Sequence, residues 1–469
     1  MKQTTLILIA FLFTLNAKAE DFQWPFLDTK AMGAETFIKQ NPEYDGRDVI
    51  IFVLDNAVDP AIPGLTETST GKTKVIDMQD FSGQTVLPLS EAENDTVEGR
   101  ILLKGGGAKL EGWDKLALSP ADDTYHISFL TEAGMYKNSP VPDLNNNGKK
   151  NDEFAFLAFK IDNAKEILNN AKGLVEPEDE MWVYYVDEDA DGNIDDETPK
   201  FNYKYNYDIF DFFKGDENTR PLVTMSANIQ NNSIVVNSSD GSHGSHCAGI
   251  AAGYEIYGNE GYNGIAPGAY VASLKIGSNA LSGGATTTES MKKAFEYGIK
   301  FMEEAGFDYA VYSMSYGIGA ELPNKTEIAK FLNNFAVQNP EAVIVNSNGN
   351  EGPGIRSTGT PAGADRIISV GAMLPPETLK ELYGSAREDN WMTHFSSRGA
   401  AVAKPDVVAP AGASSTVPAY EHGDRFWGTS MSCPQVAGAC AVLLSAAQKE
   451  NVKVNSFMIK KALKFTAKP

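Results

Sequence analysis

Residues 428–434 read Gly428-Thr429-Ser430-Met431-Ser432-Cys433-Pro434, and an apolar run from Gln435 to Ala447 follows. This turn of small residues delivers Ser430 to the start of a predicted helix, with Pro434 expected in the first turn, where proline removes no hydrogen bond. The unpaired N–H groups at a helix N-terminus favour negative charge nearby, so the position suits a nucleophile. A lone serine at such a place is more often an N-cap, and the nucleophile hypothesis therefore depends on its partners.

Strands and helices alternate along much of the chain before Ser430. Apolar runs of strand length are typical of strands buried on both faces of a parallel sheet. Such runs lie at residues 48–54, 271–276, 309–315, 341–347 and 367–371, with helices expected at 288–305 and 325–339. Strands that alternate with helices imply parallel pairing. The sequence therefore predicts an α/β fold with a mostly parallel sheet flanked by helices.

The N-terminus has the features of a secretory signal. Lys2 supplies positive charge, Leu6–Leu15 is a short apolar run, and Ala17-Lys18-Ala19 is an A-x-A cleavage site. We expect a signal peptide over residues 1–19, cleavage after Ala19, and a secreted or periplasmic protein. The apolar run is too short to span a bilayer. No later segment has about 20 uninterrupted apolar residues, so no integral membrane segment is expected after signal removal.

Composition divides the remaining chain into four segments. Residues 20–45 form an N-terminal arm with a helix expected near 31–40, and residues 46–65 form the first part of the α/β domain. Residues 66–232 are acidic, rich in asparagine and strand-like, which indicates a largely β insertion. The α/β pattern returns over residues 233–469 and forms the main part of the domain.

Charge and cysteine content restrict the classes of partner. Lys+Arg 40 against Asp+Glu 62 gives a net charge of −22, which argues against nucleic acid as a partner and suits cation binding. Three cysteines, Cys247, Cys433 and Cys440, cannot all pair within an exported chain. The last two lie about 10 Å apart along a helix, too far for a disulfide. We interpret all three as small buried residues, although Cys433 is an alternative nucleophile that is placed less well than Ser430.

Two loops of the insertion carry oxygen ligands at alternate positions. The first comprises Asp187, Asp189, Asp191, Asn193 and Asp195, and the second comprises Asp143, Asn145 and Asn147. Alternate spacing lets a tightly curled loop aim several oxygens at one cation, as in calcium loops of the EF-hand type. The twelfth position of the first loop is Thr198 where an EF-hand has a bidentate Glu. We therefore predict structural calcium loops between strands, with acidic solvated turns as the alternative.

Four polar residues stand at predicted strand ends or helix starts: Asp55, His243, Asn350 and Ser430. On its own Asp55 would be interpreted as a turn residue. His246, three residues after His243, is interpreted as a buried structural histidine. Together the four supply the groups of acyl transfer. Ser430 would attack a carbonyl, His243 would take its proton, and Asp55 would fix the imidazole tautomer. Asn350 can donate its side-chain N–H to the developing oxyanion.

These motifs, in this order, resemble those of the subtilisin-like serine peptidases. The matching stretches are Val53 to Pro60, His243 to His246, Gly264 to Ala269, Ser313 to Gly317, Gly349-Asn350, Lys404 to Pro410 and Gly428 to Pro434. The resemblance covers about residues 48–64 and 233–469. It implies a subtilisin-like fold, peptide or protein substrates, no organic cofactor, and a cleft lined by Ser315, Tyr316 and Gly317 that binds the peptide as an added strand. The chain departs from the family at Asn56-Ala57, where Thr-Gly is usual, and at Ser245, where Thr is usual.

Within that family the chain is most similar to the tripeptidyl-peptidase II branch. The similarity lies in the stretch Pro42 to Arg47 and in the long insertion between Asp55 and His243. We expect an exported serine peptidase that forms an acyl-enzyme on Ser430, an endopeptidase in preference to a tripeptidyl exopeptidase, with its oligomeric state left open. A silent calcium-binding scaffold on the same fold is the alternative of another class, and the intact set of four residues argues against it. An esterase is disfavoured because Ser430 lacks the G-x-S-x-G elbow.

Overall fold

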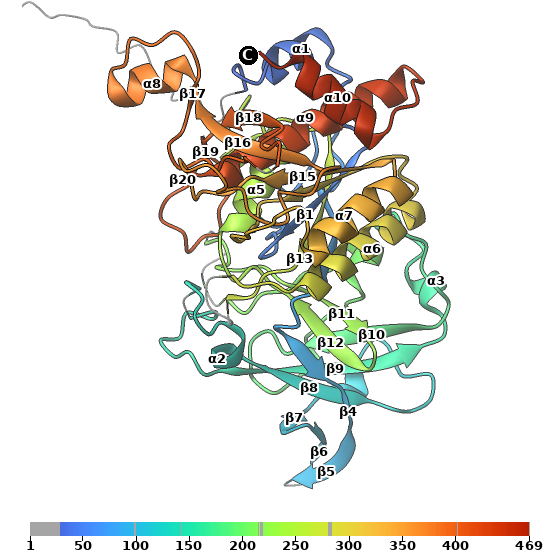
Figure 1. The fold of residues 1–469 in the computed structure, drawn as a ribbon. Helices are drawn as coiled ribbons and strands as arrows, with labels where there is room; N and C mark the ends of the chain where they lie inside the picture. Colours follow the sequence, from blue (N-terminus) through green and yellow to red (C-terminus); the bar gives the residue numbers. More distant parts are fainter. Residues whose placement is uncertain are drawn as a thin grey trace, which may run out of the picture.

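The computed structural model describes residues 29–97, 100–141, 143–213, 215, 219–279, 284–400 and 402–468. The predicted signal peptide, residues 1–19, lies outside the described residues. Figure 1 shows a parallel sheet with its helices in the upper part of the molecule and the strands of the insertion below.

The centre of the molecule is an eight-stranded, mostly parallel sheet. Its order is β17-β16-β15-β14-β1-β13-β2, and β18 pairs with β16. Among the described strands of this sheet, β17 is antiparallel to its neighbour. The strands are β1 Ile50–Asp55, β2 Val75–Asp80, β13 Tyr270–Lys275, β14 Ala310–Met314, β15 Ala342–Ser347, β16 Ile368–Leu374, β17 Trp391–Met392 and β18 Val407–Pro410. The predicted α/β class is confirmed.

The longer helices lie around this sheet, most of them on its two faces (Figure 1). They are α1 Ala34–Gln40, α5 His243–Ala252, α6 Thr288–Glu304, α7 Glu327–Gln338, α8 Pro376–Tyr383, α9 Thr429–Lys449 and α10 Ser456–Thr466. Within the described residues, α9 is the helix long and apolar enough to cross a membrane, but 72% of its apolar window is buried inside the protein. Its packing is that of a core helix.

Alternate side chains of β1 pack into two different cores, which explains its continuous apolar run. Ile50 and Phe52 pack with residues of α6 and α7 on one face of the sheet. Ile51 and Val53 pack with residues of α5 and α9 on the other face. Burying side chains of this kind stabilises the fold by about 1.5–3 kcal/mol each. The two helix layers thus fix β1, and with it Asp55 at its C-terminal end.

The insertion consists largely of antiparallel sheets, as predicted. Their orders are β10-β9-β8-β4, β11-β12-β3 and β5-β6-β7. The strands are β3 Val86–Pro88, β4 Ser90–Glu91, β5 Glu93–Val97, β6 Arg100–Gly105, β7 Ala108–Leu110, β8 His126–Thr131, β9 Glu153–Ile161, β10 Met181–Val186, β11 Ser226–Gln230 and β12 Ser233–Asn237. Short helices join them: η1 Trp113–Lys115, α2 Glu132–Met135, α3 Ala164–Ile167 and α4 Tyr203–Asn206. A separate hairpin of β19 Gly412–Ser414 and β20 Arg425–Trp427 leads into α9, and η2 Ile256–Gly258 follows α5.

One strand that the sequence assigns to the insertion belongs to the parallel sheet. β2 pairs parallel with β13, so a boundary at residue 66 falls before a strand of the α/β domain. The polar residues of β2 hide its membership. Asp77 is fully buried and accepts a hydrogen bond from the Tyr297 hydroxyl at 2.6 Å. Gln79 accepts one from Gln230 in the insertion at 3.0 Å. The predicted boundary at residue 233 falls before a strand of the insertion. That strand, β12, pairs antiparallel with β11 and β3 and lies outside the parallel sheet.

The insertion covers the edge of the parallel sheet at β2. The Tyr203 hydroxyl donates to the carbonyl of Val75 at 3.0 Å, and the Asn228 amide donates to the carbonyl of Met78 at 2.7 Å. Apolar residues of the insertion and of β1 also share one core cluster. An edge strand otherwise exposes unpaired backbone groups, so this contact protects the sheet.

Candidate active site

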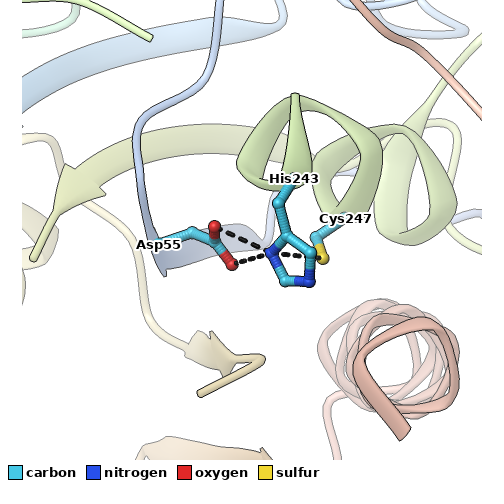
Figure 2. A group of neighbouring side chains, drawn as sticks. All are labelled: Asp55, His243 and Cys247. Atoms are coloured by element: carbon cyan, nitrogen blue, oxygen red, sulfur yellow. Dashed lines mark hydrogen bonds and ion pairs between the residues drawn. The ribbon is translucent and has the colours of Figure 1, made fainter. Parts of the chain in front are cut away.

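Asp55 and His243 meet at the C-terminal end of β1 and the first residue of α5. The Nδ1 atom of His243 lies 2.9 Å from both carboxylate oxygens of Asp55 (Figure 2). A proton on Nδ1 therefore points at the carboxylate, which leaves Nε2 as the nitrogen able to accept a proton. Burial by itself lowers the pKa of His243, but the Asp55 carboxylate more than offsets this and holds that pKa well above its usual range.

Cys247 lies beside this pair and contacts the backbone of Ser430. Its thiol lies 3.9 Å from Nδ1 of His243, one turn earlier on α5, and donates to the carbonyl of Ser430 at 3.5 Å. Figure 2 shows the thiol beside the imidazole.

The departure at Asn56 has a structural role. Its side-chain oxygen accepts a hydrogen bond from the N–H of Gly244 at 2.8 Å. That N–H is one of the unpaired donors at the start of α5. Asn56 thereby ties the strand that carries Asp55 to the helix that carries His243. Ser245 makes a second tie, since its hydroxyl accepts from the N–H of Asp59 at 3.0 Å.

Ser430 is half-buried at the second position of α9. Gly428, just before the helix, has φ 156° and ψ 170°, a conformation essentially restricted to glycine. This conformation turns the chain from β20 into α9. The Ser430 hydroxyl donates to the carbonyl of Ser315 at 3.4 Å. The predicted nucleophile therefore lies at a helix N-terminus and beside the predicted cleft.

Pro434 lies inside α9 and not in its first turn, which corrects the expectation from the sequence. Proline has no N–H, so the carbonyl of Ser430, four residues earlier, loses its helical partner. That carbonyl accepts instead from the hydroxyl of Ser315 at 2.9 Å and from the thiol of Cys247 at 3.5 Å. Pro434 thus allows Ser430 to be tied to the two segments that flank it.

Asn350 follows β15 and lies against the start of α9. Its side-chain oxygen accepts two hydrogen bonds from Thr429, from the backbone N–H at 2.9 Å and from the hydroxyl at 3.0 Å. With the oxygen held in this way, the amide NH₂ is the end that remains for a ligand. A side chain added at Gly428 would meet Nδ2 of Asn350 at 3.5 Å. That distance is ordinary van der Waals contact, so the requirement for glycine at this position comes from its φ of 156°.

The predicted cleft residues form an extended segment after β14. The carbonyl of Tyr316 accepts from the Asn346 amide at 2.9 Å, on the side of β15. Backbone groups of successive residues in an extended chain point to opposite sides. Those of Ser315 and Gly317 therefore point the other way, and the Ser315 carbonyl accepts from the Ser430 hydroxyl. Beyond them, Ile318 forms an antiparallel bridge with Thr360, with N···O distances of 2.9 and 2.8 Å.

The remaining cysteines and the second histidine have structural environments. All three cysteines are free and buried. Burial raises the pKa of Cys433 to about 12, which makes its thiolate inaccessible at neutral pH. His246 is fully buried, stacks on Phe426 with ring centroids 4.1 Å apart, and has a pKa that burial lowers to about 3. These residues lack the environment of a nucleophile or a base.

In the first acidic loop, the structure gathers Asp187 and Asp189 with Glu197, a residue that the sequence analysis missed. One oxygen from each of the three lies within 4.8 Å of the others. Burial raises the pKa of Asp187 to about 6 and that of Glu197 to about 7. Glu197 comes one residue before Thr198, and this is the signal that could have identified it.

The other predicted ligands of that loop have partners within the protein. Asp195 forms an ion pair with Lys115 and accepts from the side-chain amide of Asn193 at 2.7 Å. Asp191 accepts from the backbone N–H of Asn193, also at 2.7 Å. The group of carboxylates at Asp187 therefore includes neither Asp191 nor Asp195. Calcium in this loop stays a prediction.

In the second loop, the side-chain NH₂ groups of Asn145 and Asn147 both have a carboxylate as their partner. Both amides donate to Asp152, at 3.1 and 2.6 Å. The carboxylates of Asp143 and Asp152 also meet Glu132, which the sequence analysis did not include. Glu132 lies outside the loop, at the end of β8, so the spacing within the loop gave no signal for it.

Comparisons with known proteins agree on one family. A model of the Subtilase family matches residues 46–469. The chain is 30% identical over 486 residues to a Tripeptidyl-peptidase 2 of Caenorhabditis elegans, which covers 92% of this chain and 34% of the relative. It is 30% identical over 485 residues to the Pyrolysin of Pyrococcus furiosus, which covers 90% and 33%. The chain thus spans about a third of the length of these curated relatives.

A solved structure of Tripeptidyl Peptidase 2 supports the same assignment at the level of the fold. It superposes with a TM-score of 0.66 and 24% sequence identity, over 93% of this chain and 36% of that chain. At this identity the likeness concerns the fold, and it confirms the predicted subtilisin-like architecture. By the match over residues 46–469, the chain belongs to the subtilase family.

Proposed function

We propose that this protein is a serine endopeptidase that uses Ser430 as nucleophile, His243 as general base and Asp55 as the group that orients the base. The observation that carries the proposal is the pair of 2.9 Å contacts between Nδ1 of His243 and the Asp55 carboxylate. They fix the imidazole with Nε2 available for a proton, and Ser430 lies at the nearby N-terminus of α9. This is the division of roles that acyl transfer requires.

The chemical steps follow from these positions. Nε2 of His243 takes the hydroxyl proton of Ser430 as the oxygen attacks the peptide carbonyl. The negative charge that develops on the carbonyl oxygen is stabilised by the NH₂ group of Asn350 and by the N-terminus of α9. The protonated His243 then gives its proton to the leaving amine, and water hydrolyses the acyl-enzyme on Ser430 by the same steps.

The predicted cleft segment itself carries no carboxylate that would favour removal of tripeptides. The contact of the Ser430 hydroxyl with the carbonyl of Ser315 supports a scissile bond beside Ser315. A substrate paired antiparallel with this segment has its third residue before the scissile bond beside Gly317, two residues further on. An enzyme that counts three residues needs a carboxylate there for the substrate ammonium group. Residues 315–320 read Ser-Tyr-Gly-Ile-Gly-Ala, and Ile318 is 57% exposed.

Two alternatives can be compared with this proposal. Tripeptidyl exopeptidase activity is suggested by the names of relatives that match 92% and 97% of this chain. A silent scaffold would need one of the four polar residues to be displaced from its partners. The contacts of Asp55 with His243 and of Asn350 with Thr429 argue against displacement of those residues, whereas the hydroxyl of Ser430 has the carbonyl of Ser315 as its partner. Export is also proposed, on the signal-like residues alone, and mass spectrometry of the exported protein should give an N-terminus at Glu20.

Mass spectrometry of a defined peptide mixture, incubated with the mature protein, tests the proposed activity. Internal cuts that disappear in Ser430→Ala support the endopeptidase. Stepwise loss of three residues from free N-termini, with N-acetylated peptides left intact, would establish the tripeptidyl alternative. An absence of Ser430-dependent products from folded protein would contradict both and favour the scaffold.

A further inference from the structure

Three carboxylates of the insertion converge where β8 ends. Glu132 is the first residue of α2, and Asp143 and Asp152 belong to the second acidic loop. One oxygen from each lies within 4.8 Å of the others. Two oxygens that bind one calcium ion at about 2.4 Å are at most about 4.8 Å apart. The spacing of the three therefore fits a single shared cation.

Glu132 distinguishes this group from an ordinary acidic turn. Its side chain is 2% exposed, and Oε1 accepts from the N–H of Leu144 at 2.6 Å. Its other oxygen, Oε2, is buried and has no hydrogen-bond partner in the described part of the chain. Oδ1 of Asp143 is buried without a partner in the same way. Buried carboxylate oxygens without donors are costly, and each such case calls for a ligand or another explanation.

The surrounding charges increase that cost. Burial raises the pKa of Glu132, the N–H of Leu144 partly offsets this, and the charges of Asp143 and Asp152 raise the pKa further. A cation bound between the three carboxylates would remove this repulsion. Oxygen donors and three negative charges favour calcium over metals that prefer nitrogen or sulfur ligands.

We propose that Glu132, Asp143 and Asp152 bind one calcium ion and that this ion steadies the segment which precedes His243. The link runs through residues 136–139. Tyr136 hydrogen-bonds to Ser238, and the hydroxyl of Ser139 donates to the carbonyl of Asp240 at 2.6 Å. Calcium would hold the two ends of residues 132–152 together. This would keep residues 136–139 in contact with the turn just before His243. The metal site does not depend on the proposed function. The effect of calcium on turnover does rest on the proposed function.

Calcium titration by calorimetry tests the site in the Ser430→Ala protein, where peptidase activity cannot interfere. Glu132→Gln should bind one calcium ion fewer per chain than its parent. Glu176→Gln, at an exposed position of the same insertion, is the matched control and should bind as the parent does. Asp187→Asn reports separately on the first acidic loop. Unchanged stoichiometry and affinity in Glu132→Gln, or no calcium binding by the parent, would overturn the proposal.

Melting temperatures separate a ligand from a merely structural glutamate. Glu132→Gln removes one of three like charges and keeps an acceptor for Leu144. In chelator its melting temperature should therefore equal or exceed that of the parent, and in saturating calcium it should be lower. A lower melting temperature under both conditions would indicate a structural residue and contradict the metal site.

The link to His243 has its own readout. In the otherwise unmodified protein, calcium should raise kcat/KM, and Tyr136→Phe should reduce this effect while leaving calcium stoichiometry unchanged. If calcium raises the melting temperature without changing turnover, the link is wrong and the site stands. If folded, calcium-loaded protein shows no Ser430-dependent turnover, the proposed function fails and the site again stands.

Discussion

Thr429 holds the side-chain oxygen of Asn350 with two hydrogen bonds, from its N–H at 2.9 Å and from its hydroxyl at 3.0 Å. The residue directly before the proposed nucleophile therefore orients the proposed oxyanion donor. Because the oxygen is occupied, rotation of the amide by half a turn would break both bonds. The NH₂ group is preorganised before substrate arrives, and this is the condition under which such a donor lowers a barrier.

Asn350→Ala should lower kcat by about 100- to 1,000-fold with little change in KM, because the donor acts on the transition state. Thr429→Val removes the hydroxyl and keeps the N–H, and it should lower kcat by about 10-fold or less, as expected for one neutral hydrogen bond. Steady-state kinetics on one peptide measures both. Equal losses in the two variants would show that Thr429 has a role beyond orienting Asn350.

The pair of Asp55 and His243 makes a prediction about pH. The carboxylate raises the pKa of His243, and a general base works only when it is neutral. Activity of the parent should therefore fall as pH drops through a value above about 6.5. Asp55→Asn should lower kcat by about 10⁴-fold and shift the acidic limb of kcat/KM to lower pH. If the acidic limb of kcat/KM does not shift in Asp55→Asn, a group other than His243 causes that limb.

The contact between Asp55 and His243 should stabilise the fold less as pH rises, although activity increases in that direction. The folded pKa of His243 lies above its unfolded value, so its stabilising contribution is fully present below about pH 6.5 and is lost as pH rises through the folded pKa. Denaturant unfolding of parent and Asp55→Asn across this window should show the difference shrinking toward high pH.

Ser430 and Cys433 can be separated by a matched pair of substitutions. Ser430→Ala should reduce kcat on the order of 10⁶-fold while leaving the fold intact. Cys433→Ala should keep kcat within about 3-fold, because its thiol is buried, has a pKa raised to about 12 and donates to the carbonyl of Met314. Serine-directed phosphonates should inactivate the protein and thiol reagents should not. Thiol-dependent loss of turnover in native protein would move the nucleophile to a cysteine.

The sequence predicted those parts of the fold that depend on local patterns. The continuous apolar run of β1 predicts a strand buried on both faces, and the run of small residues after His243 predicts a closely packed helix. The sheet membership of β2 is not, because Asp77 and Gln79 find their partners in elements far away in sequence. The same reason hides Glu132, whose carboxylate meets the second loop only after β8 and β9 have paired.

The candidate site shows the same division between local and distant information. The four polar residues could be named from motifs, but the ties that position them could not. Asn56 reads as a departure from the family pattern, yet it binds the N–H of Gly244, 188 residues away. Pro434 reads as a tolerated residue of a first turn, yet it frees the carbonyl of Ser430 for partners on two other segments. Such roles depend on tertiary contacts.

Gly244 gives a test of how closely the Asp55 strand and the His243 helix must approach. A Cβ atom at this position would lie 2.2 Å from the carbonyl oxygen of Ala57 and 2.9 Å from the side-chain oxygen of Asn56. Both contacts are too short, and the first is with backbone, so α5 must shift away from β1. Gly244→Ala should therefore destabilise the protein by about 1–3 kcal/mol, as overpacking does.

The same shift would lengthen the contact between His243 and Asp55, so kcat should fall well beyond what the stability loss explains. Gly423→Ala is the matched control, because a Cβ there meets nothing within 4 Å. Denaturant unfolding and kinetics at low temperature, where Gly244→Ala remains folded, measure the two effects separately. Normal turnover by folded Gly244→Ala would mean that α5 can move without losing the base. The close approach through Asn56 would then matter for stability and not for catalysis.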